Sequence, residues 1–395
     1  MKKRLLFVAL YLRTGGVEKS LLSLLSSLDY DTYDVDLLLF DHSGLLFQEV
    51  PEKVQILPPL FETYSTPFAA ALPELVKKRH YRLLVGKLAA AIVAKLSKGV
   101  GTRGRWLIYR QLLSEPDKQY DTAISYLDFF CNYYVTEKVK AKKKIVYNHM
   151  DYLYSQKGGW PCPPLDRRCF AKSRYIVTVA ESAKASLARV FPEYVEKMRV
   201  IHNTVSAQTI TRLAGQVPME YDEQTVTVLT VARLVEEKGL FLALEACRLL
   251  VAEGYCFHWF IIGDGPLLKA LEAQIAASGL QNHFILLGEK QNPYPYMRYC
   301  DIYVQPSKTE AHCVAVEEVL VLQRPIIVTD IPAFKNQIKH RETGWSVPVS
   351  AKGLAYGIKG LLGSEPLRKR LALQSRGADK RHAKEIAKFY ALLEA

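Results

Sequence analysis

The stretch from Ser307 to Asp330 reads S-K-T-E-A-H-C-V-A-V-E-E-V-L-V-L-Q-R-P-I-I-V-T-D. Its middle, 311–322, predicts a helix between buried strands at 302–305 and 326–329. Glu310 then lies where a strand ends, and Glu318 lies about two turns inside the helix, because eight residues make roughly 2.2 turns. The free N–H groups and partial positive charge of a helix N-terminus suit a diphosphate between the two carboxylates.

The same alternation of apolar strands and helices continues on both sides of this stretch. In the second half we expect strands at 226–231, 258–262 and 284–287, helices at 240–252 and 266–277, and a short helix near Tyr296. In the first half we expect strands at 5–10, 35–40, 123–126, 144–147, 175–179 and 199–201, and helices at 17–28 and 182–190, the second capped by Ser182. Continuous apolar strands are typical of parallel sheets buried on both faces. The sequence therefore predicts an α/β protein of two doubly wound domains, with a linker at 204–223, where no apolar run occurs.

Size and composition agree with two globular domains. The chain has 395 residues, more than one ordinary hydrophobic core supports. Its hydrophobic content of 49% and charged content of 24% are typical of soluble proteins. The chain has seven cysteines, an odd number, and the spacing of Cys162 and Cys169 suits zinc poorly. We therefore expect free thiols in a reducing cytoplasm.

Two cations follow the predicted strand at 226–231. Arg233 and Lys238 lie five residues apart in V-A-R-L-V-E-E-K-G, in a strand-to-helix loop. A planar guanidinium and a compact ammonium in such a loop can converge on one diphosphate. The alternative is a solvated salt bridge with the neighbouring Glu236 and Glu237. Together with Glu310 and Glu318, the cations favour a nucleotide-sugar site.

Other predicted strand ends carry glycines and a histidine. Gly15 and Gly16 follow the first strand, and Gly263 opens the turn G-D-G-P. Each glycine permits close approach of a ligand to the backbone, and each is also compatible with an ordinary turn. His149, in N-H-M-D-Y, can hydrogen-bond a sugar hydroxyl or hold a proton, with Asp151 orienting it; the alternative is a structural histidine.

Two Asp-x-Asp pairs raise the question of a metal ion. Asp29 and Asp31, and Asp34 and Asp36, lie between the first helix and the second strand. Paired Asp can hold Mg²⁺ or Mn²⁺ on a nucleotide diphosphate. These pairs are distant in sequence from the residues above, and we interpret them as surface polar residues. No metal and no other cofactor is expected.

The net charge of +13 is concentrated in one region. Residues 77–110 contain ten Lys or Arg and no Asp or Glu. Leu84, Leu88, Ile92 and Leu96 recur at four-residue spacing within it, and Trp106 is nearby. A basic helix with an apolar stripe can lie on an anionic membrane surface, and the apolar run is too short to cross a bilayer. The alternative is a core-packed helix with a solvated basic face, and no motif indicates nucleic-acid binding.

Several of these motifs together resemble the GT-B glycosyltransferases, specifically the retaining glycosyltransferase family 4. The matching segments are G-G-V-E-K-S-L at 15–21, N-H-M-D-Y at 148–152, V-A-R-L-V-E-E-K-G at 231–239, I-I-G-D-G-P-L at 261–267, and Glu310 with Glu318 as E-x7-E. The resemblance implies two Rossmann-like domains facing a central cleft. It assigns 1–204 to acceptor binding, 205–378 to nucleotide-sugar binding, and 379–395 to a terminal helix that returns to the first domain.

The resemblance also implies roles for individual residues. Arg233 and Lys238 would hold the donor diphosphate, Glu318 the ribose, and Glu310 the donor sugar. Gly16 would lie near the phosphates and His149 near the sugar. The family commonly has small Gly residues after the first Glu, whereas Ala311, His312 and Cys313 follow here. His312 and Cys313 therefore join the expected donor-binding set, with Cys313 as a buried thiol rather than a catalyst.

The expected activity is retaining transfer from a nucleotide-sugar, with a UDP-sugar favoured, to a lipid-linked or glycan acceptor of a cell-surface polysaccharide. The leaving diphosphate would depart from the face that the acceptor hydroxyl attacks. The expected location is the cytoplasm, at the inner face of the cell membrane, with 77–110 as the contact. Two alternatives remain: a sugar-nucleotide epimerase on a similar scaffold, and a noncatalytic protein that binds membrane or nucleic acid through 77–110.

Overall fold

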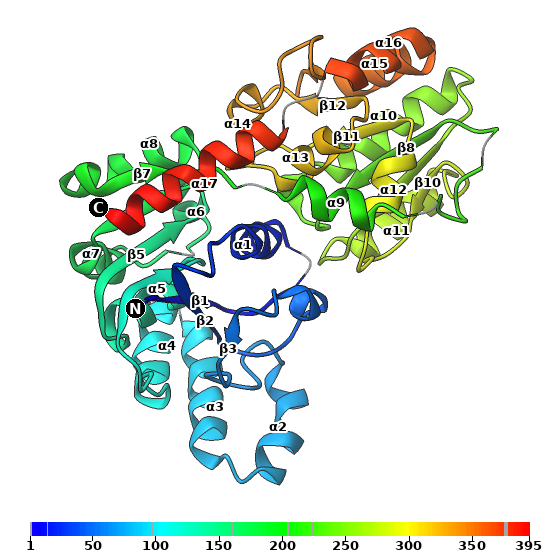
Figure 1. Ribbon diagram of the computed structural model, residues 1–395. Helices are drawn as coiled ribbons and strands as arrows, with labels where there is room; N and C mark the ends of the chain where they lie inside the picture. The colour runs from blue at the N-terminus through cyan, green and yellow to red at the C-terminus, as the bar shows by residue number, and fades with distance from the viewer. Residues whose placement is uncertain are drawn as a thin grey trace. The chain divides into compact units, whose positions relative to one another are not determined.

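The computed structural model describes residues 2–13, 15–96, 98–159, 161–203, 205–215, 217–222, 224–374 and 378–395. The chain forms two compact units (Figure 1). The first contains Met1–Asn203 together with Ile386–Ala395, and the second contains Thr204–Glu385. The predicted assignment of acceptor binding to the first domain and donor binding to the second stays a prediction.

The first unit is built on a seven-stranded parallel sheet with strand order β3-β2-β1-β4-β5-β6-β7. Its strands are β1 Lys3–Ala9, β2 Tyr33–Leu39, β3 Gln55–Ile56, β4 Tyr120–Ser125, β5 Ala141–Asn148, β6 Tyr175–Thr178 and β7 Met198–Val200. Its helices are α1 Gly16–Ser26, α2 Phe68–Lys77, α3 Tyr81–Leu96, α4 Lys98–Leu112, α5 Phe130–Lys138, α6 Tyr152–Lys157, α7 Pro163–Lys172 and α8 Glu181–Val190, with short 3₁₀ turns at Leu45–Glu49 and Pro192–Lys197.

The second unit has a six-stranded parallel sheet with strand order β10-β9-β8-β11-β12-β13. Its strands are β8 Thr227–Val231, β9 His258–Ile262, β10 Phe284–Leu286, β11 Ile302–Gln305, β12 Ile326–Thr329 and β13 Trp345–Val347. Its helices are α9 Ala207–Leu213, α10 Leu240–Ala252, α11 Leu268–Ala277, α12 Tyr294–Tyr299, α13 Val314–Val321, α14 Pro332–Lys335, α15 Ala351–Leu362 and α16 Glu365–Gln374, with a 3₁₀ turn at Glu236–Lys238.

The central strands are buried on both faces, as the apolar runs predict. In β1 the residues from Leu5 to Ala9 are all buried, and in β11 Ile302 to Gln305 are all buried. In the second unit, one apolar cluster includes Trp259 and Ile302, and another includes Phe260 and Tyr303. Successive strand residues enter different clusters because their side chains point to opposite faces of the sheet.

The final helix, α17 Ala378–Glu394, passes from the second unit into the first. The Tyr390 hydroxyl accepts from the Asp29 N–H at 2.7 Å and donates to the Ser27 carbonyl at 3.2 Å. The Tyr390 ring stacks on Tyr33 with centroids 6.0 Å apart. The last ten residues therefore pack on α1 and β2 of the first unit.

Three local predictions are wrong. The segment 204–223 contains α9, which buries Ile210 and packs against α12 and α13, so it is not only a linker. The residue that precedes α8 is Ala180, with no side-chain cap, rather than Ser182. Asp36 is not a surface residue: it is buried in β2, where Lys118 and the Tyr120 hydroxyl each donate to it at 2.8 Å.

The basic region forms α3 and α4, which pack side by side (Figure 1). Leu88 and Ile92 are exposed, as a membrane-facing stripe requires, but the side chain of Leu96 lies outside the described residues. Trp106 is fully buried, and Lys87 is buried with its ammonium group donating to the Thr63 carbonyl. Trp106 therefore belongs to the core of the first unit and does not extend the exposed stripe.

A buried carboxylate, Asp166 of α7, lies in the core of the first unit. The hydroxyls of Tyr133 and Tyr152 donate to its two oxygens at 2.7 and 2.5 Å. Burial raises the pKa of Asp166 to about 6, although the two hydroxyls oppose this shift. Asp166 thus ties α5, α6 and α7 together and has a pH-dependent charge.

Candidate functional site

The predicted cations and the first glutamate of the second unit lie at one edge of its sheet. Arg233 follows β8, Gly263 follows β9 and Glu310 follows β11, and these three strands are neighbours. The carboxyl ends of adjacent parallel strands meet at one edge, which is where doubly wound sheets bind ligands. These residues therefore lie at the carboxyl edge of the second sheet, where ligands bind in this kind of fold.

Lys238 and Glu310 form the central ion pair of this site. The Lys238 ammonium donates to Glu310 Oε1 at 2.5 Å, and the two side chains are only 17% and 10% exposed. Burial disfavours the ammonium ion, but the Glu310 carboxylate outweighs burial, and the pKa of Lys238 lies above its ordinary value. Lys238 is therefore a fixed positive charge at the sheet edge.

A chain of hydrogen bonds holds Glu310 from the side of the sheet. The Ser307 hydroxyl donates to Glu310 Oε1 at 2.7 Å and accepts from Gln305 Nε2 at 3.0 Å. The Tyr303 hydroxyl donates to Gln305 Oε1 at 2.9 Å. All three residues are fully buried. Glu310 Oε1 thus accepts from two donors, the Lys238 ammonium and the Ser307 hydroxyl, which together restrict the position of the carboxylate.

Arg233 differs from Lys238 because its side chain is exposed. Among the residues that the structure describes, its guanidinium forms no hydrogen bond and no ion pair. The predicted alternative, a salt bridge to Glu236, does not form, because Glu236 pairs with Lys308 instead. Arg233 thus presents its donor fork to solvent beside the fixed ammonium of Lys238.

Two glycines set the shape of these loops. A Cβ at Gly239, which has φ of 66°, would lie 2.0 Å from the Pro306 carbonyl, so only glycine lets the Lys238 loop reach the loop that carries Ser307. A Cβ at Gly263, with φ of 147°, would lie 1.9 Å from the Ala232 carbonyl. Gly263 is therefore required for the close packing of its own turn against the loop that carries Arg233.

The E-x7-E helix begins later than the sequence predicts. The helix α13 starts at Val314 rather than at 311, so Glu318 lies about one turn inside it. Cys313 is the residue before the helix, and its N–H donates to Gln337 Oε1 at 3.1 Å. Burial, and after it Glu310, raises the pKa of the Cys313 thiol, which agrees with a buried, unreactive thiol. His312 lies beside it, with Nε2 3.7 Å from Glu317 Oε1.

Glu318 is 1% exposed. The Tyr294 hydroxyl of α12 donates to its Oε1 at 2.9 Å. Burial, and after it the Cys313 thiol, raises the pKa of Tyr303, the first residue of the hydrogen-bonded chain that leads to Glu310. The two glutamates are thus held in the interior of one unit by different partners.

In the first unit, Gly15, Gly16 and His149 follow β1 and β5, at the carboxyl edge of that sheet. Gly15 precedes α1, and Gly16 is its first residue. The His149 ring lies against Tyr126 and Tyr147, with centroids 5.3 and 5.5 Å away. Neither ring nitrogen has a hydrogen-bond partner among the described residues, although the side chain is only 5% exposed.

Asp151 does not orient His149, which corrects the prediction. Asp151 caps α6, where it accepts from the Tyr154 N–H at 3.1 Å and from the Ser186 hydroxyl at 2.5 Å. The acid beside His149 is Asp128, which accepts from the His149 N–H at 3.1 Å and lies 3.7 Å from its Nδ1. Asp128 follows β4, the strand next to β5, which places the two residues together.

Among the described residues, no group of three or more His, Cys, Asp or Glu side chains is arranged to hold a metal ion. Asp29 accepts from the Thr32 hydroxyl at 2.5 Å and so closes a turn. The seven cysteines are free, and all except Cys256 are buried. None of the helices in the described part of the chain is long and apolar enough to cross a membrane.

Sequence reasoning missed Ser307, Gln305, Tyr294 and Asp128. A signal for two of them exists: Tyr303, Gln305 and Ser307 alternate along the end of an otherwise apolar strand, so they share one face. Polar groups on one face of a buried strand require partners, and here the partner is Glu310. Tyr294 and Asp128 reach their partners from other elements, and no local pattern indicates them.

Comparison with known proteins gives a family match in the second half of the chain. Residues 218–377 match the family model "Glycosyl transferases group 1". The amylovoran biosynthesis glycosyltransferase AmsK of Erwinia amylovora is 35% identical over 133 residues, which are 32% of this chain and 33% of the relative. The putative colanic acid biosynthesis glycosyltransferase WcaL of Escherichia coli is 29% identical over 147 residues, 35% of this chain and 36% of the relative. The matches span about a third of the length of these curated relatives.

Solved structures resemble the chain along its whole length. Anabaena HepE in complex with UDP and glucose has a TM-score of 0.70 at 15% identity, with 99% of each chain covered. A glycosyltransferase from Rickettsia africae has a TM-score of 0.68 at 18% identity, covering 100% of this chain and 98% of its own. At this identity the likeness shows the fold, and the predicted GT-B fold is confirmed.

Proposed function

We propose that this protein, whose residues 218–377 match the model of the group 1 glycosyl transferases, is a glycosyltransferase of cell-surface polysaccharide synthesis. It would transfer a sugar from a nucleotide-sugar donor to a lipid-linked or glycan acceptor. The observation that carries the proposal is the fixed Lys238–Glu310 pair beside the exposed guanidinium of Arg233, inside the matched region. The names of AmsK and WcaL support a polysaccharide product, and the UDP bound to HepE supports a UDP-sugar donor.

The charges of the second unit suit a donor diphosphate. Lys238 offers a fixed ammonium, and Arg233 offers a planar fork that closes on phosphate oxygens when the donor arrives. Both cations would stabilise the negative charge that develops on the leaving diphosphate. We assign Glu310 to the donor sugar and Glu318 to the ribose, with Gly263, His312 and Cys313 bordering this donor site.

The residues of the first unit keep the roles that the resemblance implies. Gly15 and Gly16 border phosphate, and His149 hydrogen-bonds a sugar hydroxyl. Among the described residues neither nitrogen of the buried His149 ring forms a hydrogen bond, which supports this role, because such an imidazole gains a hydrogen bond when a hydroxyl arrives. The predicted Asp151 partner is replaced by Asp128.

The proposed chemistry retains the configuration of the sugar. The bond between sugar C1 and the diphosphate oxygen breaks, and the electron pair leaves with the diphosphate. The acceptor oxygen bonds to C1 from the same face, and its proton passes to the departing phosphate oxygen. We propose that no metal ion takes part, so EDTA should leave turnover unchanged; a loss that Mg²⁺ or Mn²⁺ restores would overturn this point.

The test is a panel of UDP-, GDP- and dTDP-sugars with and without candidate acceptors. Acceptor-dependent release of a nucleoside diphosphate supports the proposal, and sugar isomerisation without an acceptor supports an epimerase. Thermal shifts with the same donors test the site, because a ligand stabilises the native state in proportion to its occupancy. Arg233→Ala and Glu318→Ala should abolish most of the shift, and Arg370→Ala and Glu272→Ala, on exposed helix faces, should keep it.

For the region 77–110 we propose contact with an anionic membrane surface, at the cytoplasmic face of the cell membrane. Its support is the exposure of Tyr81, Val85 and Ile92 on α3, at 56%, 65% and 56%, among basic residues. Val85→Glu with Ile92→Glu should lose binding to phosphatidylglycerol vesicles while donor turnover with a soluble acceptor is kept. If the double variant binds vesicles like the parent, the exposed face belongs to solvent. Vesicle or nucleic-acid binding without any turnover would instead support the noncatalytic alternative.

A further inference from the structure

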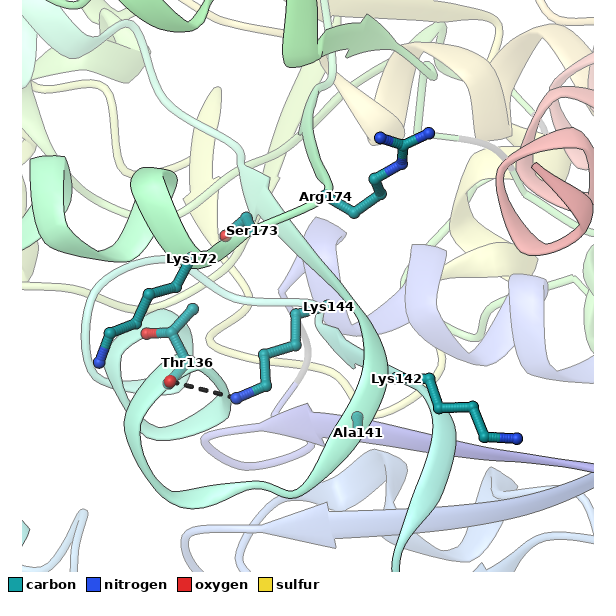
Figure 2. Close-up of a pocket in the computed structure, with 7 residues that line it drawn as sticks. All are labelled: Thr136, Ala141, Lys142, Lys144, Lys172, Ser173 and Arg174. Atoms are coloured by element: carbon teal, nitrogen blue, oxygen red, sulfur yellow. Dashed lines mark hydrogen bonds between the residues drawn. The ribbon is translucent and has the colours of Figure 1, made fainter.

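A second cationic site lies at the opposite edge of the first sheet, where the strands begin. A hollow of about 530 Å³ is lined by Thr136, Ala141, Lys142, Lys144, Lys172, Ser173 and Arg174 (Figure 2). Four of these residues are cationic, and no carboxylate is among them. Ligands of the reaction bind at the carboxyl ends of the strands, so this hollow is separate from the proposed reaction site.

Lys144 and Lys172 both line the hollow. In Figure 2 both side chains extend toward Thr136, whereas those of Lys142 and Arg174 extend away from them. Lys144 donates to the Thr136 carbonyl at 3.2 Å, and its other two N–H donors have no hydrogen-bond acceptor among the described residues. Lys172 makes no hydrogen bond or ion pair with any described residue. Two ammonium groups thus line one hollow, and no carboxylate is among the residues that line it.

The surrounding charges increase this unbalanced positive potential. Burial, and after it Lys172, lowers the pKa of Lys144; burial, followed by Lys3 and Arg174, lowers the pKa of Lys143. A second hollow of about 650 Å³ adjoins the first along Ala141, Lys142 and Lys144. It adds Lys2, Arg4 and Lys140 and contains one carboxylate, Asp121, which already accepts from Lys142 at 2.7 Å.

Several neighbouring lysines have an ordinary structural role, and they are not part of the site. Lys197 donates to three carbonyls at the end of α7, and Lys143 donates to the carbonyls of Leu392 and Leu393 at the end of α17. Such contacts satisfy the last carbonyls of a helix. Carbonyl contacts of this kind account for the positions of Lys143 and Lys197. They do not account for Lys172, or for the remaining N–H donors of Lys144.

We propose that this hollow binds a phosphate-class anion, held between the ammonium groups of Lys144 and Lys172 with Arg174 and Lys142 at the rim. An ammonium group is a compact donor that suits phosphate oxygens, and an anion here would relieve the mutual repulsion of the cations. A free diphosphate and a phospholipid headgroup present the same chemistry. The inference does not depend on the proposed transferase activity.

The experiment compares three full-length proteins at low ionic strength: the parent, Lys144→Gln/Lys172→Gln, and the charge-matched control Lys339→Gln/Lys352→Gln on exposed positions of the second unit. Calorimetric titration with inorganic pyrophosphate is one arm. Sedimentation with vesicles of phosphatidylglycerol or of phosphatidylcholine is the other. The proposed donor site and the proposed membrane contact at 77–110 are the same in all three proteins, so differences between them report on the hollow.

We expect the Lys144/Lys172 variant to bind its anion about tenfold more weakly than the parent, because two charge-assisted contacts are lost, and the control to match the parent. A loss for pyrophosphate identifies a soluble phosphate, and a loss confined to phosphatidylglycerol vesicles identifies a headgroup. Equal binding by all three proteins in both arms, or equal weakening of both variants, overturns the proposal. Lys172→Gln alone, which removes no hydrogen bond to any described residue, should give part of the loss with an unchanged melting temperature.

Discussion

Replacing Glu310 by Gln should change the stability of the protein and its affinity for UDP in opposite directions. The substitution keeps the size of the side chain and the hydrogen bond from Ser307, and it removes the charge that faces the Lys238 ammonium at 2.5 Å. Lys238 then becomes a largely buried cation without a counter-ion. If the site binds a diphosphate, the same change frees Lys238 for the ligand.

The two effects have opposite signs. Removing one partner of a buried ion pair costs about 3–5 kcal/mol, whereas an exposed pair contributes about 0–1 kcal/mol. With side chains 17% and 10% exposed, we expect a loss of roughly 2–3 kcal/mol in the free energy of unfolding. Such a loss lowers the melting temperature by about 5–10 °C. A unit charge about 6 Å from a diphosphate charge contributes at most ~3 kcal/mol at an effective dielectric constant of about 20, so UDP should bind Glu310→Gln about tenfold more tightly.

The assay measures melting temperature, the dissociation constant of UDP and turnover on the same preparations. We expect lower stability, tighter UDP binding and turnover reduced about 100-fold, because Glu310 is assigned to the transferring sugar. The double variant Glu310→Gln/Lys238→Met should recover most of the stability and lose the tighter binding. Weaker UDP binding together with parental turnover would refute both the assignment of Lys238 to the diphosphate and that of Glu310 to the sugar.

Ser307→Ala should lower stability by about 1.5–3 kcal/mol and turnover about tenfold, with UDP affinity little changed, because Glu310 loses a hydrogen bond but keeps its charge; an unchanged melting curve and rate would argue against the hydrogen-bonded chain. Tyr294→Phe should weaken UDP binding about tenfold if Glu318 holds the ribose, as calorimetry would measure, and should leave it unchanged if Glu318 is only structural. Asp166 has a folded-state pKa of about 6 against 3.8 for the free side chain, so the folded protein holds a proton that the unfolded chain releases. Its contribution to the free energy of unfolding, about 3 kcal/mol, is present below pH ~4 and lost as pH rises through ~6. Urea unfolding at both ends of this window should therefore show a lower free energy of unfolding at the higher pH in the parent, and this difference should be absent in Asp166→Asn.

The elements that sequence predicts best are apolar runs with sharp ends. The predicted bounds of α10, β9, β11 and β12 agree with the structure, because each run is closed by glycine, proline or a polar residue. The helix α9 was missed because it is only seven residues long, and it is stabilised by packing against α12 and α13 rather than by its own pattern. The later start of α13 has a similar cause, since Gln337 from another segment accepts from the N–H before the helix.

The candidate site shows the same division between local and tertiary information. Strand ends predict which residues reach the sheet edge, and they correctly bring Arg233, Lys238 and Glu310 to one edge. They do not predict which cation is paired, and the sequence treats the two cations as equivalent. In the structure, Lys238 is fixed by Glu310 and Arg233 is left exposed. A fixed ammonium avoids reorganisation when charge develops, whereas an exposed guanidinium adapts to the ligand as it enters. Exchanging them, with Lys at 233 and Arg at 238, should therefore impair turnover although the total charge is unchanged, because only one of the two positions is preorganised.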